Sequence, residues 1–449
     1  MLEIINATFT PFQIGLLSFP VLLILIALRI PLAASMFVVG LLGTYVVAGN
    51  MRMMDSQLKT FTYGTLTSYS LSIIPLFLLM SEFATRGGMS TALFKAAEAW
   101  LGHRRGGLAM AAIGASAGFG AVCGSSLATA SAMGRVALPE LDRASYSGAL
   151  STGALAAGGT LGILIPPSVV LVVYAILAEE NIEKLFTAAL IPGILAMLGY
   201  MLTVAVYTRV VPGSGNALPR MPYRERLRAL GNVWPVMVIF GLVIGGIYSG
   251  AFSPTAAAAV GVAGTAIVAW ANGGLTVASA KQALLSTAQT SAMIFFIVLA
   301  AGVFNSFLSS TQLPQTLANY FLNTDVSPWT ILIGMLLLYL ILGTVMDSLA
   351  MIFLTVPIFV PIITQLDFGI PSAEIGIWFG VLVLMSAEIG LITPPVGMNL
   401  FVINSMSKGV RISQTYRGAI PFVISDIVRI AVLVAFPTIT MFLVRLFYE

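Results

Sequence analysis

The chain has 449 residues, of which 58% are hydrophobic and 8% are charged, and its formal net charge is +4. Soluble domains carry about a quarter charged residues, so this composition excludes a soluble protein and predicts an all-α, polytopic membrane protein. The modest charge gives no sign of nucleic-acid binding. The single cysteine, Cys123, excludes an intramolecular disulfide and a cysteine-built metal site.

The first apolar segment runs from Ile14 to Val47 and is interrupted by the sequence LRIPLA. This pattern leaves two interpretations open, a pair of spans or one bent span. The preceding MLEIINATFT has no basic residue, which argues against a cleaved secretory signal and favours an N-terminus outside the cytoplasm.

A re-entrant helical hairpin is predicted between Gly107 and Pro139. Its arms are at the lower length limit for a membrane span, and they meet at CGSSLAT, where serine and threonine suit the N-cap of the second arm. Its small residues favour close packing on neighbouring helices. The only histidine, His103, lies in the loop before this hairpin and is expected to be solvated.

A broken helix is predicted over about residues 146–178. Its uncharged stretch GGTLGILIPPSVVLVV contains Pro166 and Pro167. Proline removes a backbone donor and disrupts the preceding turn, and hydrocarbon offers no water to the freed carbonyl groups. Such a break is tolerated where it faces protein or a watery cavity, so the prolines indicate a binding site. A simple kink is the alternative interpretation.

A basic connection from Arg209 to Gly231 is placed in the cytoplasm by its arginines. After it the chain repeats its scheme, with a hairpin over about residues 331–364 and a broken helix over about residues 373–407. The motif GLITPPV follows GILIPPS by 228 residues, and Ser348 of the second SLA motif follows Ser126 of the first by 222. We therefore predict two repeats, residues 1–228 and 229–449, as in many secondary transporters.

Polar oxygens gather near these interruptions. Asp347 lies in an apolar stretch, where an acid is costly and by default functional, although it could also serve as a helix cap. Glu388, just before the second double proline, is a weaker candidate ligand. Neutral oxygens that together favour a hard cation such as sodium come from Ser125, Ser126, Thr129, Thr160, Thr393 and Asn399.

Fixed positive charge is absent from the two cores. No Lys or Arg lies between Ile331 and Ser407, and no charged residue lies between Gly107 and Gly134 or in residues 144–178. The charge of an anionic substrate would therefore have to be met by bound cations and by the N-termini of half-helices. Arg105 and Arg135, at the edges of the first hairpin, are the nearest exceptions.

Four motifs in this order resemble the large membrane subunit of the tripartite ATP-independent periplasmic (TRAP) transporters: CGSSLATASAMGRVALPEL, GGTLGILIPPS, GTVMDSLAMIFLTVPIFVPII and GLITPPVGMNLFV. The resemblance covers nearly the whole chain. It implies the fold of the ion-transporter superfamily, with inverted repeats, a scaffold and an elevator-type transport domain. It also implies an inner-membrane location in a bacterium or archaeon, and sodium-driven import of an organic acid such as a C4-dicarboxylate or a sialic acid, without a cofactor or enzyme activity.

The same resemblance implies two partners. One is a periplasmic binding protein that delivers the substrate. The other is a small four-helix membrane subunit, which we expect to be a separate chain because only about ten residues precede the first apolar segment.

Site residues are carried over from the family by position. Sodium is expected at the first hairpin tip, at a break around Gly158–Thr160 and at their counterparts in the second half, that is, at Gly124, Ser125, Ser126, Thr129, Gly158, Gly159, Thr160, Asp347, Ser348, Gly390, Thr393, Pro394 and Gly397. The substrate is expected between the two tips, beside Ser125, Ser126, Pro166, Pro167, Ser348, Pro395 and Asn399.

Three other functions compete with this one. A cation-coupled carboxylate symporter of the same superfamily would work alone on dissolved substrate. A channel would also explain broken helices and pore-lining oxygens. An intramembrane hydrolase is disfavoured, because the sequence has no HExxH motif and no histidine outside the loop.

Overall fold

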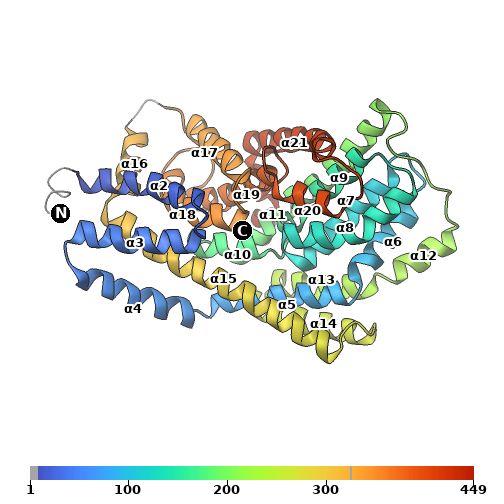
Figure 1. Cartoon of the computed structure of the whole chain (residues 1–449), viewed down its shortest axis with the longest axis horizontal. Coiled ribbons are helices and arrows are strands. Elements are labelled where there is room, and N and C mark those ends of the chain that lie inside the picture. Colours follow the sequence, from blue (N-terminus) through green and yellow to red (C-terminus); the bar gives the residue numbers. More distant parts are fainter. Residues whose placement is uncertain (1–8, 324–325, 449) are drawn as a thin grey trace. The chain divides into compact units, whose positions relative to one another are not determined.

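The computed structural model describes residues 9–323 and 326–448, and all regular structure in that part of the chain is helical. This confirms the all-α fold class (Figure 1). The helices of the first half are α2 (Pro11–Ala27), α3 (Leu32–Ala48), α4 (Met51–Thr67), η1 (Ser70–Ser72), α5 (Ile73–Arg86), α6 (Met89–Leu101), α7 (Gly107–Cys123), α8 (Ser126–Arg143), α9 (Gly148–Leu164), α10 (Val169–Leu177), α11 (Ile182–Val210) and α12 (Tyr223–Gly231). Those of the second half are α13 (Trp234–Tyr248), α14 (Pro254–Ala271), α15 (Val277–Ser310), α16 (Leu313–Leu322), α17 (Pro328–Gly343), α18 (Ser348–Ile363), α19 (Ser372–Leu391), α20 (Met398–Met406), α21 (Ile412–Ala435) and α22 (Pro437–Tyr448).

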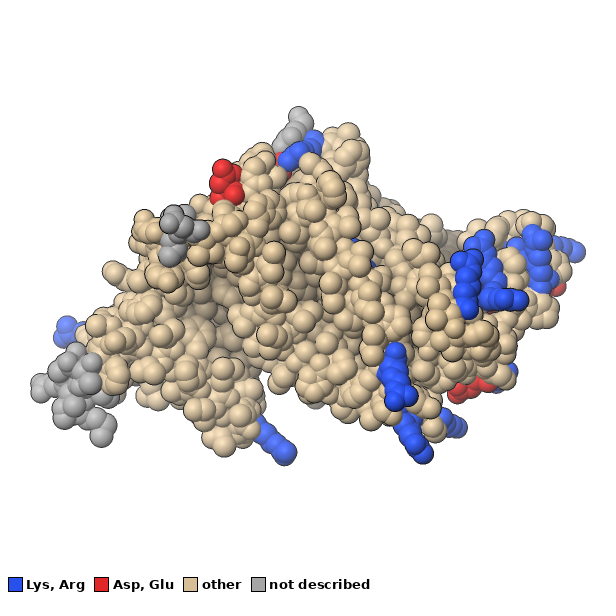
Figure 2. Space-filling model, turned by 90° about the horizontal axis from the view of Figure 1, so that it is seen from above, with Lys and Arg blue, Asp and Glu red and all other residues tan. Residues whose placement is uncertain are grey.

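The helices have the length and apolar character of membrane spans. Within the described residues, five helices are long and apolar enough to cross a membrane alone, and up to eight spans result if each bent pair counts as one. Charged side chains are sparse on the face shown in Figure 2. A multi-pass membrane protein is thereby confirmed.

The chain forms two compact units. The first comprises the chain up to Ser72 together with Ala288–Met335 and Leu349–Gly376. The second comprises Ile73–Thr287, Leu336–Ser348 and Ile377–Glu449. Each unit draws segments from both halves of the sequence, so the compact units follow helix packing rather than chain order.

In the first unit, the interruption in the first apolar segment separates two helices. α2 ends at Ala27, α3 begins at Leu32, and the two helices pack against each other. Arg29, between them, has a φ of 66°, which is incompatible with a continuous α-helix. The segment therefore forms two packed apolar helices of 17 residues each rather than one bent helix.

In the second unit, helices from both sequence halves share one core. α7, α8 and α9 pack together, and α20 and α21 pack on α9 (Figure 1). Small residues allow this closeness: Gly153 of α9 meets the backbone of Gly418 on α21, leaving no room for a Cβ. The second unit contains all of the residues that the sequence predicted as a binding site.

Candidate functional site

The first predicted hairpin is present and turns at Gly124 and Ser125. α7 ends at Cys123, and Gly124 adopts a φ of 65°, which favours glycine. Ser125 then caps α8, accepting a 3.4 Å hydrogen bond from the amide of Ala128. A Cβ on Gly124 would lie 3.0 Å from the carbonyl oxygen of Pro167. The hairpin tip therefore lies directly against the first double proline.

The first broken helix is also present, and it breaks at the double proline. α9 ends at Leu164, and α10 begins at Val169 after a cap by Ser168, whose hydroxyl accepts a 3.4 Å hydrogen bond from the amide of Leu171. Pro166 and Pro167 are buried, so the irregular backbone faces protein rather than lipid.

The expected break around Gly158–Thr160 is wrong. These residues lie inside the continuous helix α9, which ends at Leu164. Glycine, unlike proline, keeps its backbone N–H donor and does not interrupt the helix. Here the glycines allow close packing, because a Cβ on Gly159 would lie 2.6 Å from the Cβ of Ala130 on α8. The helix is interrupted only where Pro166 removes a donor.

The tip of the second hairpin lies against the second helix break. α17 ends at Gly343 and α18 begins at Ser348, while α19 ends at Leu391 and α20 begins at Met398. The amide of Gly397 donates a 3.4 Å hydrogen bond to the carbonyl of Thr344 at the hairpin tip. The Tyr416 hydroxyl donates a 2.6 Å hydrogen bond to the carbonyl of Pro395. Unlike the first pair, Pro394 and Pro395 are exposed.

Equivalent glycines join hairpin to broken helix in each half. A Cβ on Gly120 of α7 would lie 2.6 Å from the Cα of Gly162 on α9. A Cβ on Gly390 of α19 would meet the backbone of Gly343 on α17 just as closely. Gly162 and Gly390 open the matching motifs GILIPPS and GLITPPV. The sequence repeat thus has a structural counterpart at these two helix crossings.

Glu388 connects the two hairpin tips. It lies in the last turn of α19 and is 1% exposed. The Ser348 hydroxyl, at the second tip, donates a 2.6 Å hydrogen bond to its Oε1. The Ser126 hydroxyl, at the first tip, is a second polar neighbour of the same carboxylate. Sequence reasoning ranked Glu388 below Asp347, yet Glu388 is the acid that is buried between the tips.

Three buried side-chain oxygens of this unit, one of them on Glu388, lack hydrogen-bond partners. In the described part of the chain, Glu388 Oε2, Thr129 Oγ1 and Asn399 Oδ1 are buried and make no hydrogen bond. Asn399, at the start of α20, donates from Nδ2 to the carbonyl of Ala156 on α9 at 3.3 Å. Buried oxygens are normally hydrogen-bonded, so this set fits a cation that takes oxygen ligands.

Asp347 lies beside Ser348 at the second tip and is only partly buried. It is close enough to Glu388 for the two carboxylates to repel each other. A bound cation would relieve that repulsion. No cluster of three or more His, Cys, Asp or Glu side chains suited to a metal ion occurs among the described residues.

Two predicted oxygens are engaged elsewhere. The Thr393 hydroxyl donates to the carbonyl of Ile389 at 2.6 Å, within its own helix segment. The Thr160 hydroxyl lies 2.7 Å from the carbonyl of Ala157 and 3.0 Å from the Tyr200 hydroxyl. Sequence reasoning missed this second contact, which leads to a buried ion pair between Asp426 and Arg429 on α21. The signal was available, since two charges in an apolar helix are costly.

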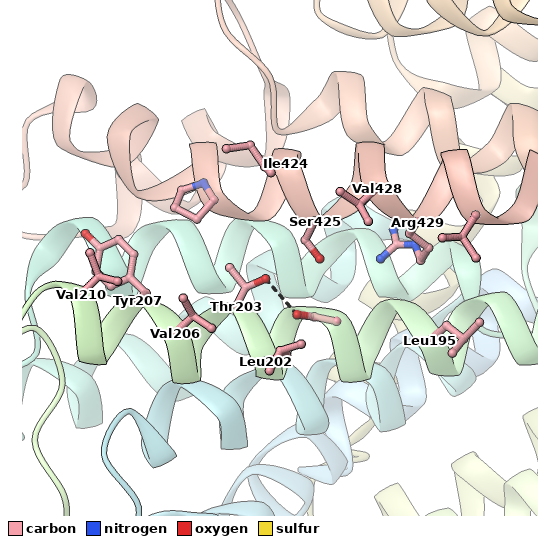
Figure 3. A pocket seen from close by; sticks show the side chains of 13 residues that line it. Leu195, Leu202, Thr203, Val206, Tyr207, Val210, Ile424, Ser425, Val428 and Arg429 are labelled. Atoms are coloured by element: carbon pink, nitrogen blue, oxygen red, sulfur yellow. Dashed lines mark hydrogen bonds between the residues drawn. The ribbon is translucent and has the colours of Figure 1, made fainter.

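One cavity in this unit lies away from the predicted site. It is an apolar groove of about 600 Å³ between α11 and α21 (Figure 3). Leu195, Leu202 and Val206 line it on α11, and Ile424 and Val428 line it on α21. It touches none of the predicted sodium or substrate residues.

Comparison with known proteins identifies the family. Residues 19–439 match the model of the tripartite ATP-independent periplasmic transporter, DctM component. The chain is 38% identical over 380 residues to the C4-dicarboxylate TRAP transporter large permease protein DctM of Pseudomonas aeruginosa, covering 84% of this chain and 87% of that one. It is 32% identical over 389 residues to the sialic acid TRAP transporter large permease protein SiaM of Vibrio cholerae, covering 86% and 88%.

A solved structure shares the fold. The crystal structure of the Alcanivorax borkumensis YdaH transporter aligns with a TM-score of 0.63 at 15% sequence identity, covering 86% of this chain and 88% of that one. These matches confirm the resemblance seen in the sequence motifs. The chain belongs to the large permease, or DctM, component of the TRAP transporters, a family of secondary transporters of organic acids, and is a multi-pass protein of the inner membrane.

Proposed function

We propose that this chain imports an organic acid anion together with sodium ions. The single observation that carries the proposal is the position of Glu388, which accepts a hydrogen bond from Ser348 and has Ser126 as a neighbour. A buried carboxylate is stable in its charged form when a positive charge lies beside it. No Lys or Arg lies between Ile331 and Ser407, and we propose that a bound cation supplies this charge.

Thr129 and Asn399 complete the proposed oxygen ligands. Each has a buried, unpartnered oxygen. The cation would fasten the second-half residues Glu388 and Asn399 to the first-half residue Thr129. Sodium suits neutral oxygens with few carboxylates, as the breaks of other transporters illustrate.

Helix N-termini supply the remaining attraction for an anion. α8 begins at Ser126, α10 at Val169 and α20 at Met398, each directly after a tip or a break. The positive ends of such half-helices favour carboxylate groups. With sodium bound at Glu388, the region between the tips would accept an organic acid that it would otherwise repel.

The substrate class follows from named relatives. The Pseudomonas aeruginosa protein is named for C4-dicarboxylates and the Vibrio cholerae protein for sialic acid. Both substrates are carboxylates, so we propose a carboxylate substrate here. We further propose delivery by a periplasmic binding protein, assembly with a small membrane subunit, and transport by an elevator movement of the bundle that holds both tips.

The test is uptake into proteoliposomes that contain this chain together with a small membrane subunit and a periplasmic binding protein of the same family. A panel of radiolabelled C4-dicarboxylates and sialic acids would be offered with an inward sodium gradient, and with an equal potassium gradient as the control. We expect saturable accumulation with sodium only. Accumulation that is equal in potassium would contradict sodium coupling.

A stand-alone symporter is the second candidate, because the oxygen set described above lies entirely within this chain. The same proteoliposomes without the binding protein discriminate between the two candidates. Sodium-driven uptake of dissolved substrate at an undiminished rate would favour the stand-alone carrier. Uptake that appears only on addition of the binding protein supports the tripartite assembly.

A further inference from the structure

A chain of buried polar groups links the first broken helix to α21. The Tyr200 hydroxyl, on α11, donates a 2.7 Å hydrogen bond to Asp426 Oδ2. The Thr160 hydroxyl, on α9, lies 3.0 Å from the Tyr200 oxygen. Arg429 pairs with Asp426 at 2.5 Å, and its guanidinium lies 5.2 Å from the centroid of the Tyr200 ring. All four residues are buried, in helices of a membrane protein.

The number of hydroxyl hydrogens available fixes the direction of the hydrogen bonds among these residues. A tyrosine hydroxyl has one hydrogen, and Tyr200 gives it to the Asp426 carboxylate. Its oxygen therefore accepts from Thr160, which also has a single hydrogen. Thr160 must then choose between Tyr200 and the carbonyl of Ala157, 2.7 Å away. The Tyr200 oxygen thus competes with the Ala157 carbonyl of α9 for the single hydrogen of the Thr160 hydroxyl.

Thr160 lies one helical turn before the end of α9 at Leu164. The same face of α11 holds that end at a second point: a Cβ on Gly193 would lie 3.0 Å from the carbonyl oxygen of Leu164 and 2.9 Å from Cγ1 of Ile165. Two contacts from α11 therefore fix the last turn of α9 immediately before the double proline.

Packing alone does not explain the ion pair. Buried ion pairs are often replaced by apolar residues without loss of stability, and charges inside a membrane default to functional roles. Arg429 Nε and Nη1 have no hydrogen-bond partner among the described residues, so the pair is not optimised as an isolated bridge. What the pair does achieve is a fixed acceptor for the Tyr200 hydroxyl.

We propose that Asp426, Arg429 and Tyr200 are positioning residues that hold the Thr160 hydroxyl, and with it the start of the first break, in the geometry that sodium binding requires. The inference rests on the proposed sodium coupling and adds a support that lies outside the predicted site. Thr160 acts one helical turn before the break, and the other three residues act through it.

The test uses the reconstituted assembly with two readouts. Hydrogen–deuterium exchange of peptides covering residues 155–171 reports the order of the break without any ligand. The sodium-induced rise in melting temperature, compared with potassium at equal ionic strength, reports sodium binding. Tyr200→Phe and Thr160→Val each delete one hydroxyl with little change of shape. Thr160→Ser restores the hydroxyl and serves as the rescue.

The groove in Figure 3 offers matched controls. Tyr207 and Thr203 lie on the same helix as Tyr200 and line the groove outside the polar chain. Tyr207→Phe and Thr203→Val remove the same kinds of hydroxyl group without altering the hydrogen bonds that link Thr160, Tyr200 and Asp426. The pair Asp426→Asn with Arg429→Gln removes both charges together, which avoids leaving one of them buried alone.

Losing one hydrogen bond should accelerate exchange at the break and raise the sodium concentration for half-maximal stabilisation, each by about 3- to 10-fold. The double variant Asp426→Asn with Arg429→Gln should change both readouts in the same direction, whereas Tyr207→Phe, Thr203→Val and Thr160→Ser should stay near wild type. Unchanged exchange in Tyr200→Phe overturns the inference, and so does faster exchange with an unchanged sodium midpoint. Faster exchange in a protein whose wild type shows no sodium-specific shift instead overturns the proposed sodium coupling and leaves the positioning of the break standing.

Discussion

The Ser348 hydroxyl donates a 2.6 Å hydrogen bond to Oε1 of Glu388, joining the tip of the second hairpin to the last turn of α19. Hydrogen bonds to a charged group contribute about 1.5–3 kcal/mol, and this one is buried. Because Ser126 of the first hairpin neighbours the same carboxylate, the Glu388 side chain lies next to both tips. Any movement of either tip must therefore change the environment of Glu388.

Glu388→Gln tests whether this carboxylate binds the coupling ion. The amide keeps the size of the side chain and removes the charge. We expect sodium-driven uptake to fall about 10- to 100-fold, as for loss of a charge-assisted contact, and the sodium midpoint to rise. Uptake at several sodium concentrations provides the measurement.

Glu179→Gln is the matched control, because Glu179 is exposed in the loop before α11. It should leave both the rate and the sodium midpoint unchanged. If Glu388→Gln transports at the wild-type rate with an unaltered sodium midpoint, the carboxylate is structural and the proposed cation site is wrong.

Ser348→Ala tests the contact itself. Without its donor, Oε1 of Glu388 is left buried and unpaired, which costs about 1–3 kcal/mol. The melting temperature of the purified protein should fall. In the Glu388→Gln background the same substitution should cost much less, because the charged acceptor is gone. A double-mutant cycle on melting temperature measures the difference, and strictly additive losses would contradict the coupling.

Ser126→Ala changes the first hairpin tip, and Asp347→Ala changes the second. We expect both to raise the sodium concentration needed for half-maximal uptake, since Ser126 neighbours Glu388 and Asp347 adds negative charge beside it. Unchanged sodium dependence in both variants would remove these residues from the site. Ser131→Ala is the control for Ser126→Ala, because Ser131 lies five residues further along α8 and its hydroxyl accepts a 3.2 Å hydrogen bond from Arg135.

The hairpins and the double-proline breaks were predictable from sequence because their causes are local. Pro166 removes a donor wherever it stands, and Gly124 followed by Ser125 encodes a turn and a cap within a few residues. The split between α2 and α3 was left open, because LRIPLA signals an interruption without specifying whether the chain reverses. The positive φ at Arg29 and the packing of α2 against α3 decided it.

The rest depended on contacts distant in sequence. Glycine is found both at helix breaks and in closely packed helices, so the sequence pattern predicted a break at Gly158 and Gly159. In the structure these glycines lie inside α9 and allow neighbouring helices to pack closely. The link from Thr160 through Tyr200 to Asp426 spans α9, α11 and α21, and no local pattern places those residues together. The choice between Asp347 and Glu388 depended on which acid is buried between the tips, and that is decided by contacts between elements distant in sequence.

Gly120→Ala and Gly390→Ala test the equivalent helix crossings of the two halves. Each adds a methyl group where the neighbouring backbone already fills the space, so overpacking should cost about 1–3 kcal/mol. Both variants should lower the melting temperature and reduce uptake. Gly334→Ala is the control, because a Cβ there meets nothing within 4 Å. If alanine at the two crossings lowers the melting temperature no more than alanine at Gly334 does, the close packing does not contribute to stability.

The last prediction concerns His103, the only histidine of the chain. Burial of Nδ1 in its loop lowers the pKa of His103, and Arg226, Arg220 and Arg104 lower it further. The imidazole is therefore neutral in the fold at a pH where the unfolded chain already binds a proton. Stability should decrease as pH falls through the ordinary histidine value of about 6.5, because the unfolded state then takes up more protons.

The imidazole proton resonance of the untagged protein, followed against pH, measures this pKa without ambiguity because no other histidine is present. The exposed Arg220 provides the variant: Arg220→Gln should raise the pKa of His103 toward its ordinary value, and so should added salt, which screens the surrounding cations. His103→Gln should flatten the dependence of melting temperature on pH between about 5 and 7. A titration midpoint above the ordinary value would mean that a carboxylate, rather than the arginines, dominates this loop.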